Sequence, residues 1–232
     1  MSSAMVKRAV PVYLEVGNRR VFAGALDWPG WCRSGRDEET ALRALVAYGP
    51  RYAAAIGALA RRFMAPTDTS ALDVVERLDG DATTDFGAPA MAPAADDRPL
   101  DGRELERLQG LLQACWAAFD AATEAASSAV LRKGPRGGGR DVGRIVAHVL
   151  EADRAYLSLL WSAYRKAGDA DLTVEMDRLR EAILDALRSR ASGDPLPEGR
   201  RSTRVWTPRY FVRRSAWHAL DHAWEIEDRV EE

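Results

Sequence analysis

The sequence has few of the features that mark membrane, secreted or nucleic-acid-binding proteins. No apolar run is long enough to cross a bilayer, and no long apolar core follows the first charges, so we expect no signal peptide. Cys32 and Cys115 fit no metal or redox spacing and are interpreted as packing residues. The 33 basic and 35 acidic residues are balanced in both halves. These absences favour a cytoplasmic protein with reduced thiols, and favour neither nucleic acid nor membrane as a partner.

Histidine is equally scarce, with three residues in 232. His218 and His222 lie four apart within residues 217–229, so a helix places them on one face about one turn apart. Two neutral imidazoles at that spacing can bind one metal ion from the same side. His148 lies in an earlier amphipathic segment, and alone it would be interpreted as a core histidine.

The first hundred residues predict a small β/α domain. Residues 10–16 and 21–26 predict a hairpin across the turn at Gly17 and Asn18. Asp37 predicts the start of a helix that Pro50 ends or kinks, and a second helix is expected over 51–63. Residues 72–78 fit a strand or a short helix. Residues 80–99 are rich in Asp, Pro and Ala and predict a linker, which leaves domains at 1–79 and 100–232.

The segment GALDWPGWCRSGRDEETALRAL, with the two strands before it, resembles the HicB-like family over about residues 10–48. Members carry a D-x-P-G turn, a polar stretch and an acidic helix start. They occur as antitoxins and as appended modules, and no segment of helix-turn-helix type is evident in this chain. The alternative is a structural β/α cap.

The remaining residues predict helices over 101–129, 141–167, 172–191 and 208–230. Glycine-rich or proline-rich breaks at 134–139 and 193–199 separate them. Asp141 and the pair Thr207-Pro208 are good helix starts. We therefore predict an α+β protein in which a small β-hairpin/helix domain precedes an antiparallel four-helix bundle.

The last of these helices has an unusual polar face. That face carries Phe211, Ser215, His218, His222 and Glu225. Burying several polar groups without partners costs roughly 1–3 kcal/mol each. A metal ion or a polar pocket removes this conflict, and His148 lies on an inward stripe of its own helix.

The sequences GRIVAHVLEADRAYL and RRSAWHALDHAWEIEDR resemble the DinB-like (YfiT/DinB) superfamily, and the resemblance covers residues 101–230. Its members are four-helix bundles with one ligand histidine on the second helix and an H-x-x-x-H pair on the fourth. The resemblance implies that His148, His218 and His222 are metal ligands. The superfamily includes S-transferases that use mycothiol or bacillithiol, a mycothiol-dependent maleylpyruvate isomerase and many members without known activity, and its members are often dimers.

Three histidine ligands leave at least one coordination position open, as in catalytic zinc sites. Zinc is the first choice, and nickel or iron would accept the same ligands. A bound thiol would become a thiolate nucleophile, whereas bound water would become hydroxide. Glu225 and Glu151, each three residues after a histidine, are the candidate bases or orienting groups; each could instead be an exposed helix carboxylate.

Two basic clusters could hold an anionic substrate or cofactor, with Arg140 and Arg214 as the candidate binding residues. The first comprises Arg132, Lys133, Arg136 and Arg140. The second comprises Arg200, Arg201, Arg204, Arg209, Arg213 and Arg214. The alternatives are a solvated face paired with acidic residues and, for the second cluster, a nucleic-acid surface.

The sequence thus predicts a metal-dependent transferase that activates a low-molecular-weight thiol, such as mycothiol or bacillithiol, for attack on a small electrophile. The alternatives are a metal-dependent hydrolase on the same site, a non-enzymatic metal- or ligand-binding protein, and a regulatory protein. A small-molecule substrate and a homodimer are the expected partners.

Overall fold

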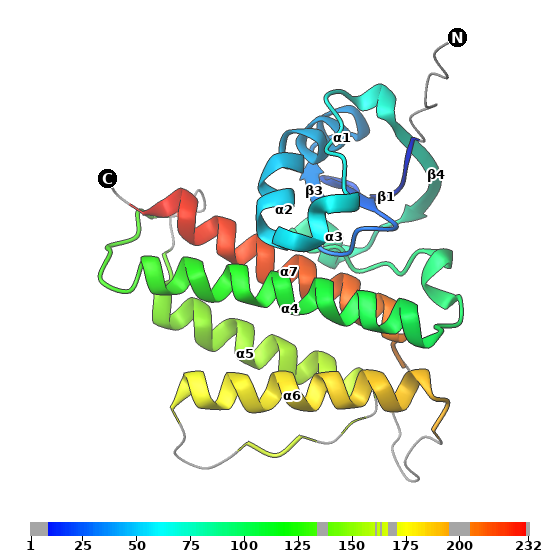
Figure 1. The fold of residues 1–232 in the computed structure, drawn as a ribbon. Coiled ribbons are helices and arrows are strands. Elements are labelled where there is room, and N and C mark those ends of the chain that lie inside the picture. The colour runs from blue at the N-terminus through cyan, green and yellow to red at the C-terminus, as the bar shows by residue number, and fades with distance from the viewer. Residues whose placement is uncertain are drawn as a thin grey trace. The chain divides into compact units, whose positions relative to one another are not determined.

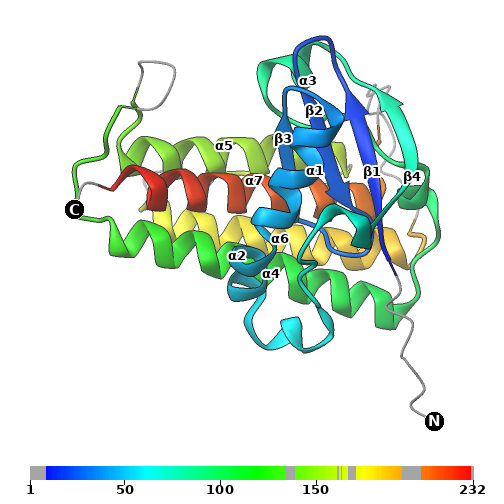
Figure 2. The same cartoon turned by 90° about the horizontal axis from the view of Figure 1, so that it is seen from above.

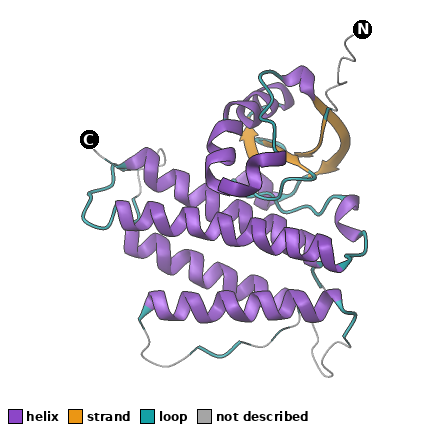
Figure 3. Ribbon diagram, in the orientation of Figure 1, coloured by secondary structure: helices purple, strands orange, loops and turns teal. Residues whose placement is uncertain are grey.

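The computed structural model describes residues 9–133, 139–160, 162, 164–166, 171–194 and 205–230. The chain divides into two compact units, Met1–Ala95 and Asp96–Glu232. The protein belongs to the α+β class, with a four-stranded sheet in the first unit and long helices in the second (Figure 3). Among the described residues, no helix combines the length and apolar character that crossing a membrane requires.

The first unit is built on a sheet in the order β3-β2-β1-β4. Its strands are β1 (Val10–Val16), β2 (Val21–Ala25), β3 (Cys32–Gly35) and β4 (Leu72–Asp79). The hairpin prediction is confirmed, because β1 and β2 pair antiparallel. The ambiguous segment after residue 71 is a strand, parallel to β1. The sequence prediction missed β3, which is short and polar.

Two helices follow the third strand. Helix α1 (Glu38–Ala47) begins at Asp37, whose side chain accepts a hydrogen bond from the Thr40 backbone as predicted. Pro50 lies in the first turn of α2 (Gly49–Ile56), where a missing N–H costs nothing. The rest of the expected second helix is a 3-10 helix, Gly57–Arg62. It begins at a glycine with a φ of +52°, where the α-helical path ends.

The predicted linker contains ordered structure packed on the sheet. Asp81 caps the short helix α3 (Ala82–Phe86). Thr84 donates a hydrogen bond to the fully buried carboxylate of Glu15 on β1, at 2.5 Å. The same carboxylate accepts backbone N–H bonds from Ala90 and Met91. Burial raises the pKa of Glu15, and these bonds act in the opposite direction.

The second unit contains four long helices that lie side by side (Figures 1 and 2). They are α4 (Gly102–Ala125), α5 (Val142–Leu159), α6 (Leu172–Ala191) and α7 (Pro208–Arg229). Each begins at a side chain that accepts a backbone hydrogen bond from its first turn, and Asp141 and Thr207 do so as predicted. The breaks expected over 134–139 and 193–199 lie mostly outside the described residues.

The directions of these helices differ from the expected antiparallel order. Arg209 pairs with Glu104 where α7 and α4 begin, and Arg132 N–H donates to the Arg229 carbonyl where they end, so these helices run the same way. Trp206 N–H donates to the Leu159 carbonyl, so α5 ends where α7 starts. Helix α5 therefore runs opposite to α7.

Contacts between α4 and α6 give the last direction. Gln109 bonds to the Leu184 carbonyl and Asp120 bonds to Arg180, so α6 runs opposite to α4 and in the same direction as α5. Twelve residues separate α5 from α6 in the sequence. They can span up to about 40 Å, enough to return along an 18-residue helix of about 27 Å.

Candidate metal centre

The structure brings the three histidines of the chain together. His148 comes from α5, and His218 and His222 come from successive turns of α7. One ring nitrogen from each lies within 4.8 Å of those of the other two. The ring centres are 4.6 Å apart for His218 and His222, and 5.2 and 5.0 Å from His148 to these two. The packing of α5 against α7 thus places His148 beside the pair on α7.

Burial favours the neutral form of two of these imidazoles, His148 and His218. His218 and His222 are buried, and His148 is partly exposed. Burial is the main reason that the pKa of His148 falls to about 4, and electrostatic interactions with His222 and Arg140 lower it further. Burial likewise holds the pKa of His218 well below its usual range. Neutral imidazole is the form that binds a metal ion, so the cluster suits metal binding at neutral pH.

Glu225 orients one of the three rings. Its Oε2 lies 2.7 Å from Nδ1 of His222, and its Oε1 accepts a hydrogen bond from Nη1 of Arg229 at 2.5 Å. The hydrogen bond with His222 lowers the pKa of Glu225, and Arg229 adds to this against the opposing effect of burial. An ionised carboxylate accepts the Nδ1 proton and leaves the Nε2 lone pair of His222 for a ligand.

Arg229 in turn fixes Glu225 to the connection between α4 and α5. Its side chain is buried, and it donates from Nε to the Arg132 carbonyl at 2.7 Å and from Nη2 to the Arg140 carbonyl at 3.0 Å. A short β-bridge between Leu131 and Val230 lies beside these bonds. The orienting carboxylate therefore has little freedom to move.

A metal ion fits the unsatisfied groups of this cluster. The Nδ1 atom of His218 is buried and makes no hydrogen bond within the described part of the chain. Leaving a buried polar atom without a partner costs about 1–3 kcal/mol, and coordination to an ion would remove that cost. With three imidazole nitrogens converging and one ring oriented by a carboxylate, the cluster could hold a metal ion.

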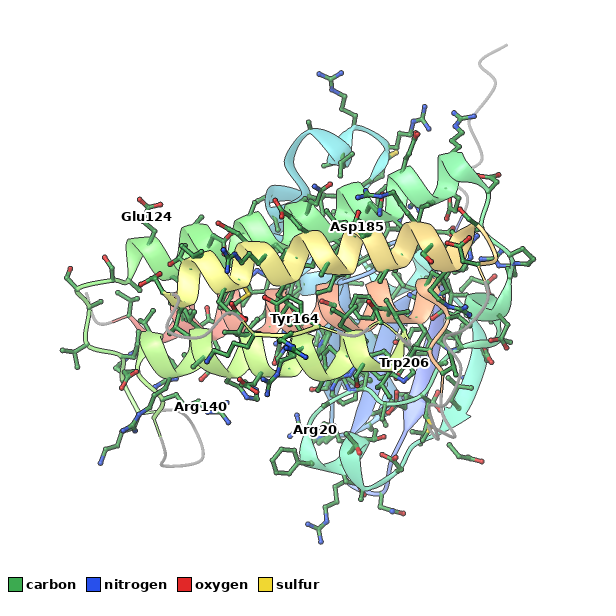
Figure 4. The ribbon with its side chains drawn as sticks, turned by 90° about the horizontal axis from the view of Figure 1, so that it is seen from below. Arg20, Glu124, Arg140, Tyr164, Asp185 and Trp206 are labelled. Carbon is green, nitrogen blue, oxygen red and sulfur yellow. The ribbon has the colours of Figure 1, made fainter. Side chains whose placement is uncertain are left out.

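Of the two glutamates expected near the metal, only Glu225 contacts a histidine in the described structure. Glu151 is exposed and pairs with Arg154 one turn farther along α5. A surface pocket of about 330 Å³ is lined by Glu151, Arg154, Ala155, Ser158, Ser162 and Tyr164. Figure 4 shows Tyr164 between α5 and α6.

The two arginines singled out from the sequence differ in exposure. Arg140 is exposed near the start of α5 (Figure 4), and its charge acts on His148 and His218. Arg214 is buried one turn before His218 on α7. Its guanidinium carbon lies 5.2 Å from the ring centre of Tyr156 and 4.6 Å from that of Trp217.

Other members of the second basic cluster hold the second unit together. Arg213 is buried and makes two 2.7 Å hydrogen bonds to the buried carboxylate of Asp96. Arg209 bonds to Glu104 at 2.9 Å and to two backbone carbonyls. The interpretation of a solvated face is therefore wrong for Arg213. Arg136, Arg200, Arg201 and Arg204 lie outside the described residues.

A buried carboxyl group lies between α5 and α7 and was not predicted from the sequence. Asp153 is 1% exposed, and its Oδ1 accepts a hydrogen bond from Ser215 at 2.8 Å. Burial raises its pKa to about 6, although the Ser215 bond and the charge of Arg180 lower it. The available signal was Ser215 on the polar face of α7, which needed a polar partner on a neighbouring helix.

No family model matches the chain, and no match was found among curated proteins or solved structures. The class that the structure itself defines is an α+β protein whose helical unit holds a cluster of three histidines able to bind a metal ion.

Proposed function

We propose that the second unit is a DinB-like four-helix bundle that binds a divalent metal ion through His148, His218 and His222. The observation that carries the proposal is the convergence of three imidazole nitrogens from α5 and α7. Their placement supports the resemblance, because the single histidine lies on the second long helix and the pair on the fourth.

Zinc is the ion that we propose first. Imidazole nitrogens suit zinc, and the cluster requires no change of oxidation state. Nickel and iron accept the same nitrogens and remain the other candidates. Both cysteines of the chain are buried, and Cys115 has a pKa raised by burial, so neither is proposed as an additional ligand.

We propose that the site serves a thiol-dependent transferase, in which a low-molecular-weight thiol such as mycothiol or bacillithiol attacks a small electrophile. A divalent ion supplies one property when bound, which is to lower the pKa of a thiol in its open position. The histidines hold the ion, and Glu225 orients His222. Because both carboxylate oxygens of Glu225 are engaged, we assign it a positioning role.

The first unit is proposed to be a HicB-like module. The hairpin β1–β2, the turn at Asp27–Gly30 and the acidic start of α1 follow one another in the order that the resemblance requires. Buried aromatic side chains fix the turn: Trp31 donates to the Leu45 carbonyl and Tyr52 donates to the Pro29 carbonyl, both at 2.8 Å. These contacts give the DWPG turn a structural role. We propose no reaction for this unit.

Metal content tests the first part of the proposal. Purified protein should contain about one divalent ion per chain by mass spectrometry of the metals, and the double variant His218→Ala/His222→Ala should contain none. A double variant Arg188→Met/Asp185→Ala, which changes an exposed pair on α6, should keep the metal. Equal metal content in the wild type and the histidine variant would refute the metal site.

Thiol conjugation tests the reaction. The metal-loaded protein should accelerate the conjugation of mycothiol or bacillithiol with chlorodinitrobenzene, and a chelator should abolish the effect. Hydrolysis of ester or amide substrates without any thiol requirement would instead establish the hydrolase. A metal-loaded protein that accelerates neither reaction would favour a binding role.

A further inference from the structure

Arg214 differs from the neighbouring arginines of α7 in having no acidic partner among the residues that the structure describes. Arg209 and Arg213 each pair with a carboxylate. The guanidinium of Arg214 makes no ion pair or hydrogen bond within the described residues, and its buried Nη1 is left without a partner. Only 9% of the residue is exposed.

Aromatic rings hold this guanidinium beside the histidines. Its Cζ atom lies 5.2 Å from the ring centre of Tyr156 and 4.6 Å from that of Trp217. The same two rings lie 5.9 and 6.1 Å from the ring centre of His218. Arg214 and His218 are also four residues apart on α7, so their side chains share a face. The unpaired charge is therefore contiguous with the metal centre.

Within the described part of the chain, no carboxylate forms an ion pair with this charge. Two aromatic faces attract a cation, but this attraction is weaker than the cost of keeping a guanidinium out of water without an anion. Asp153 is an acidic group whose charge interacts with Arg214, but its Oδ1 accepts its hydrogen bond from Ser215, and it forms no ion pair or hydrogen bond with the guanidinium within the described residues. A bound anion would supply the missing partner.

We propose that Arg214 binds the carboxylate of an acidic small molecule whose reactive group lies at the three-histidine centre. The inference deepens the proposed function and rests on it for the position of the reacting atom. The planar guanidinium matches a carboxylate through two parallel N–H bonds. One carboxylate also balances the single unpaired charge.

The carboxylate could belong to the thiol or to the electrophile, and two pairs of probes distinguish these sources. Mercaptoacetate and mercaptoethanol are acidic and neutral thiols of similar size. Phenylacetate and phenylacetamide are acidic and neutral compounds without a thiol. Cobalt-loaded protein reports thiol binding through its sulfur-to-metal absorption band, and calorimetry reports binding of the second pair.

In at least one pair, the acidic member should bind the wild type about 10- to 100-fold more tightly than the neutral member. Arg214→Met should remove this preference. Arg214→Lys should retain part of it, because lysine keeps the positive charge but lacks the planar guanidinium that forms two parallel bonds. Arg188→Met, at an exposed and paired arginine of α6, should keep it. A thermal melt of each variant establishes that it is folded.

The inference is overturned if the wild type shows no preference in either pair, or if the preference survives in Arg214→Met because the metal alone binds the carboxylate. Tighter binding of inorganic phosphate than of the acidic probes would also overturn the assignment to carboxylates. The two proposals can also fail separately. If neither thiol produces the cobalt band but the binding of phenylacetate still requires Arg214, the thiol-dependent function is refuted and the carboxylate site is supported.

Discussion

The Nδ1 atom of His222 lies 2.7 Å from Oε2 of Glu225, one turn farther along α7. This bond fixes which nitrogen of His222 carries the proton, and so which nitrogen is left for a ligand. Glu225 is itself held by Arg229, so the orientation of one histidine depends on residues outside the histidine cluster.

Substituting Glu225→Gln should weaken metal affinity by about 10- to 100-fold, because the neutral amide is a poorer acceptor for the Nδ1 proton. Competition with a coloured chelator measures the affinity. Glu227→Gln, at an exposed position of the same helix, is the matched control and should bind metal like the wild type. Equal affinities for the two variants would show that Glu225 does not orient His222.

Substituting Arg229→Met should lower both stability and metal affinity. The variant loses the bonds to Glu225 and to the Arg132 and Arg140 carbonyls, and it leaves those acceptors unpaired. We expect a loss of about 2–4 kcal/mol in the free energy of unfolding of the metal-free protein. Chemical denaturation in chelator measures it. A loss below about 0.5 kcal/mol would contradict a structural role for this bond network.

The buried pair of Asp96 and Arg213 provides a test of the second unit. Asp96→Ala leaves a buried guanidinium without its carboxylate and should cost about 3–5 kcal/mol in the free energy of unfolding. The double variant Asp96→Leu/Arg213→Met should be much less destabilised, since it removes both charges. Asp185→Ala breaks an exposed pair and should cost about 1 kcal/mol or less. A double variant as unstable as Asp96→Ala would contradict this account.

Asp153 predicts a pH dependence of stability. Its pKa is 3.8 when unfolded and about 6 when folded, so between these values the folded state binds more protons. The free energy of unfolding should therefore fall as pH rises through this window, by up to about 3 kcal/mol at about 1.4 kcal/mol per pKa unit. Asp153→Asn cannot titrate and should lack this contribution. Denaturation of both proteins in chelator at pH 4 and pH 7 measures the difference, and parallel pH profiles would contradict the prediction.

Removing the metal should lower the melting temperature of the wild type. An ion that binds only the folded protein adds about 2.7 kcal/mol when its concentration is 100 times the dissociation constant. A chelator should abolish this contribution, while His148→Ala should melt at nearly the same temperature with or without metal. An equal change in the melting temperature of the two proteins on adding the chelator would show that the ion binds at another site.

Local patterns predicted the elements and the histidine face because they depend on neighbouring residues. Asp37, Asp141 and Thr207 are short polar caps that start helices regardless of distant contacts. Helical periodicity placed His218, His222 and Glu225 on one face of α7. These relationships extend over a few residues and are therefore visible in the sequence.

Other features depend on contacts that sequence patterns do not encode. The direction of α6 follows from its packing against α4, through the contacts of Gln109 with Leu184 and of Asp120 with Arg180. Strand β3 forms because a buried β2 provides a partner for four mostly polar residues. The difference between Arg213 and Arg214, which are adjacent in sequence, arises because Asp96 reaches only one of them.

The histidines come from α5 and α7, and α6 lies between these helices in the chain. An ion bound to His148 and His218 would close a loop of about 70 residues, as a cross-link does, and would reduce the freedom of the unfolded chain. Loading with metal would thus stabilise α6, which supplies none of the three histidines. Protection of α6 amides from hydrogen exchange would then report the occupancy of a site on two other helices.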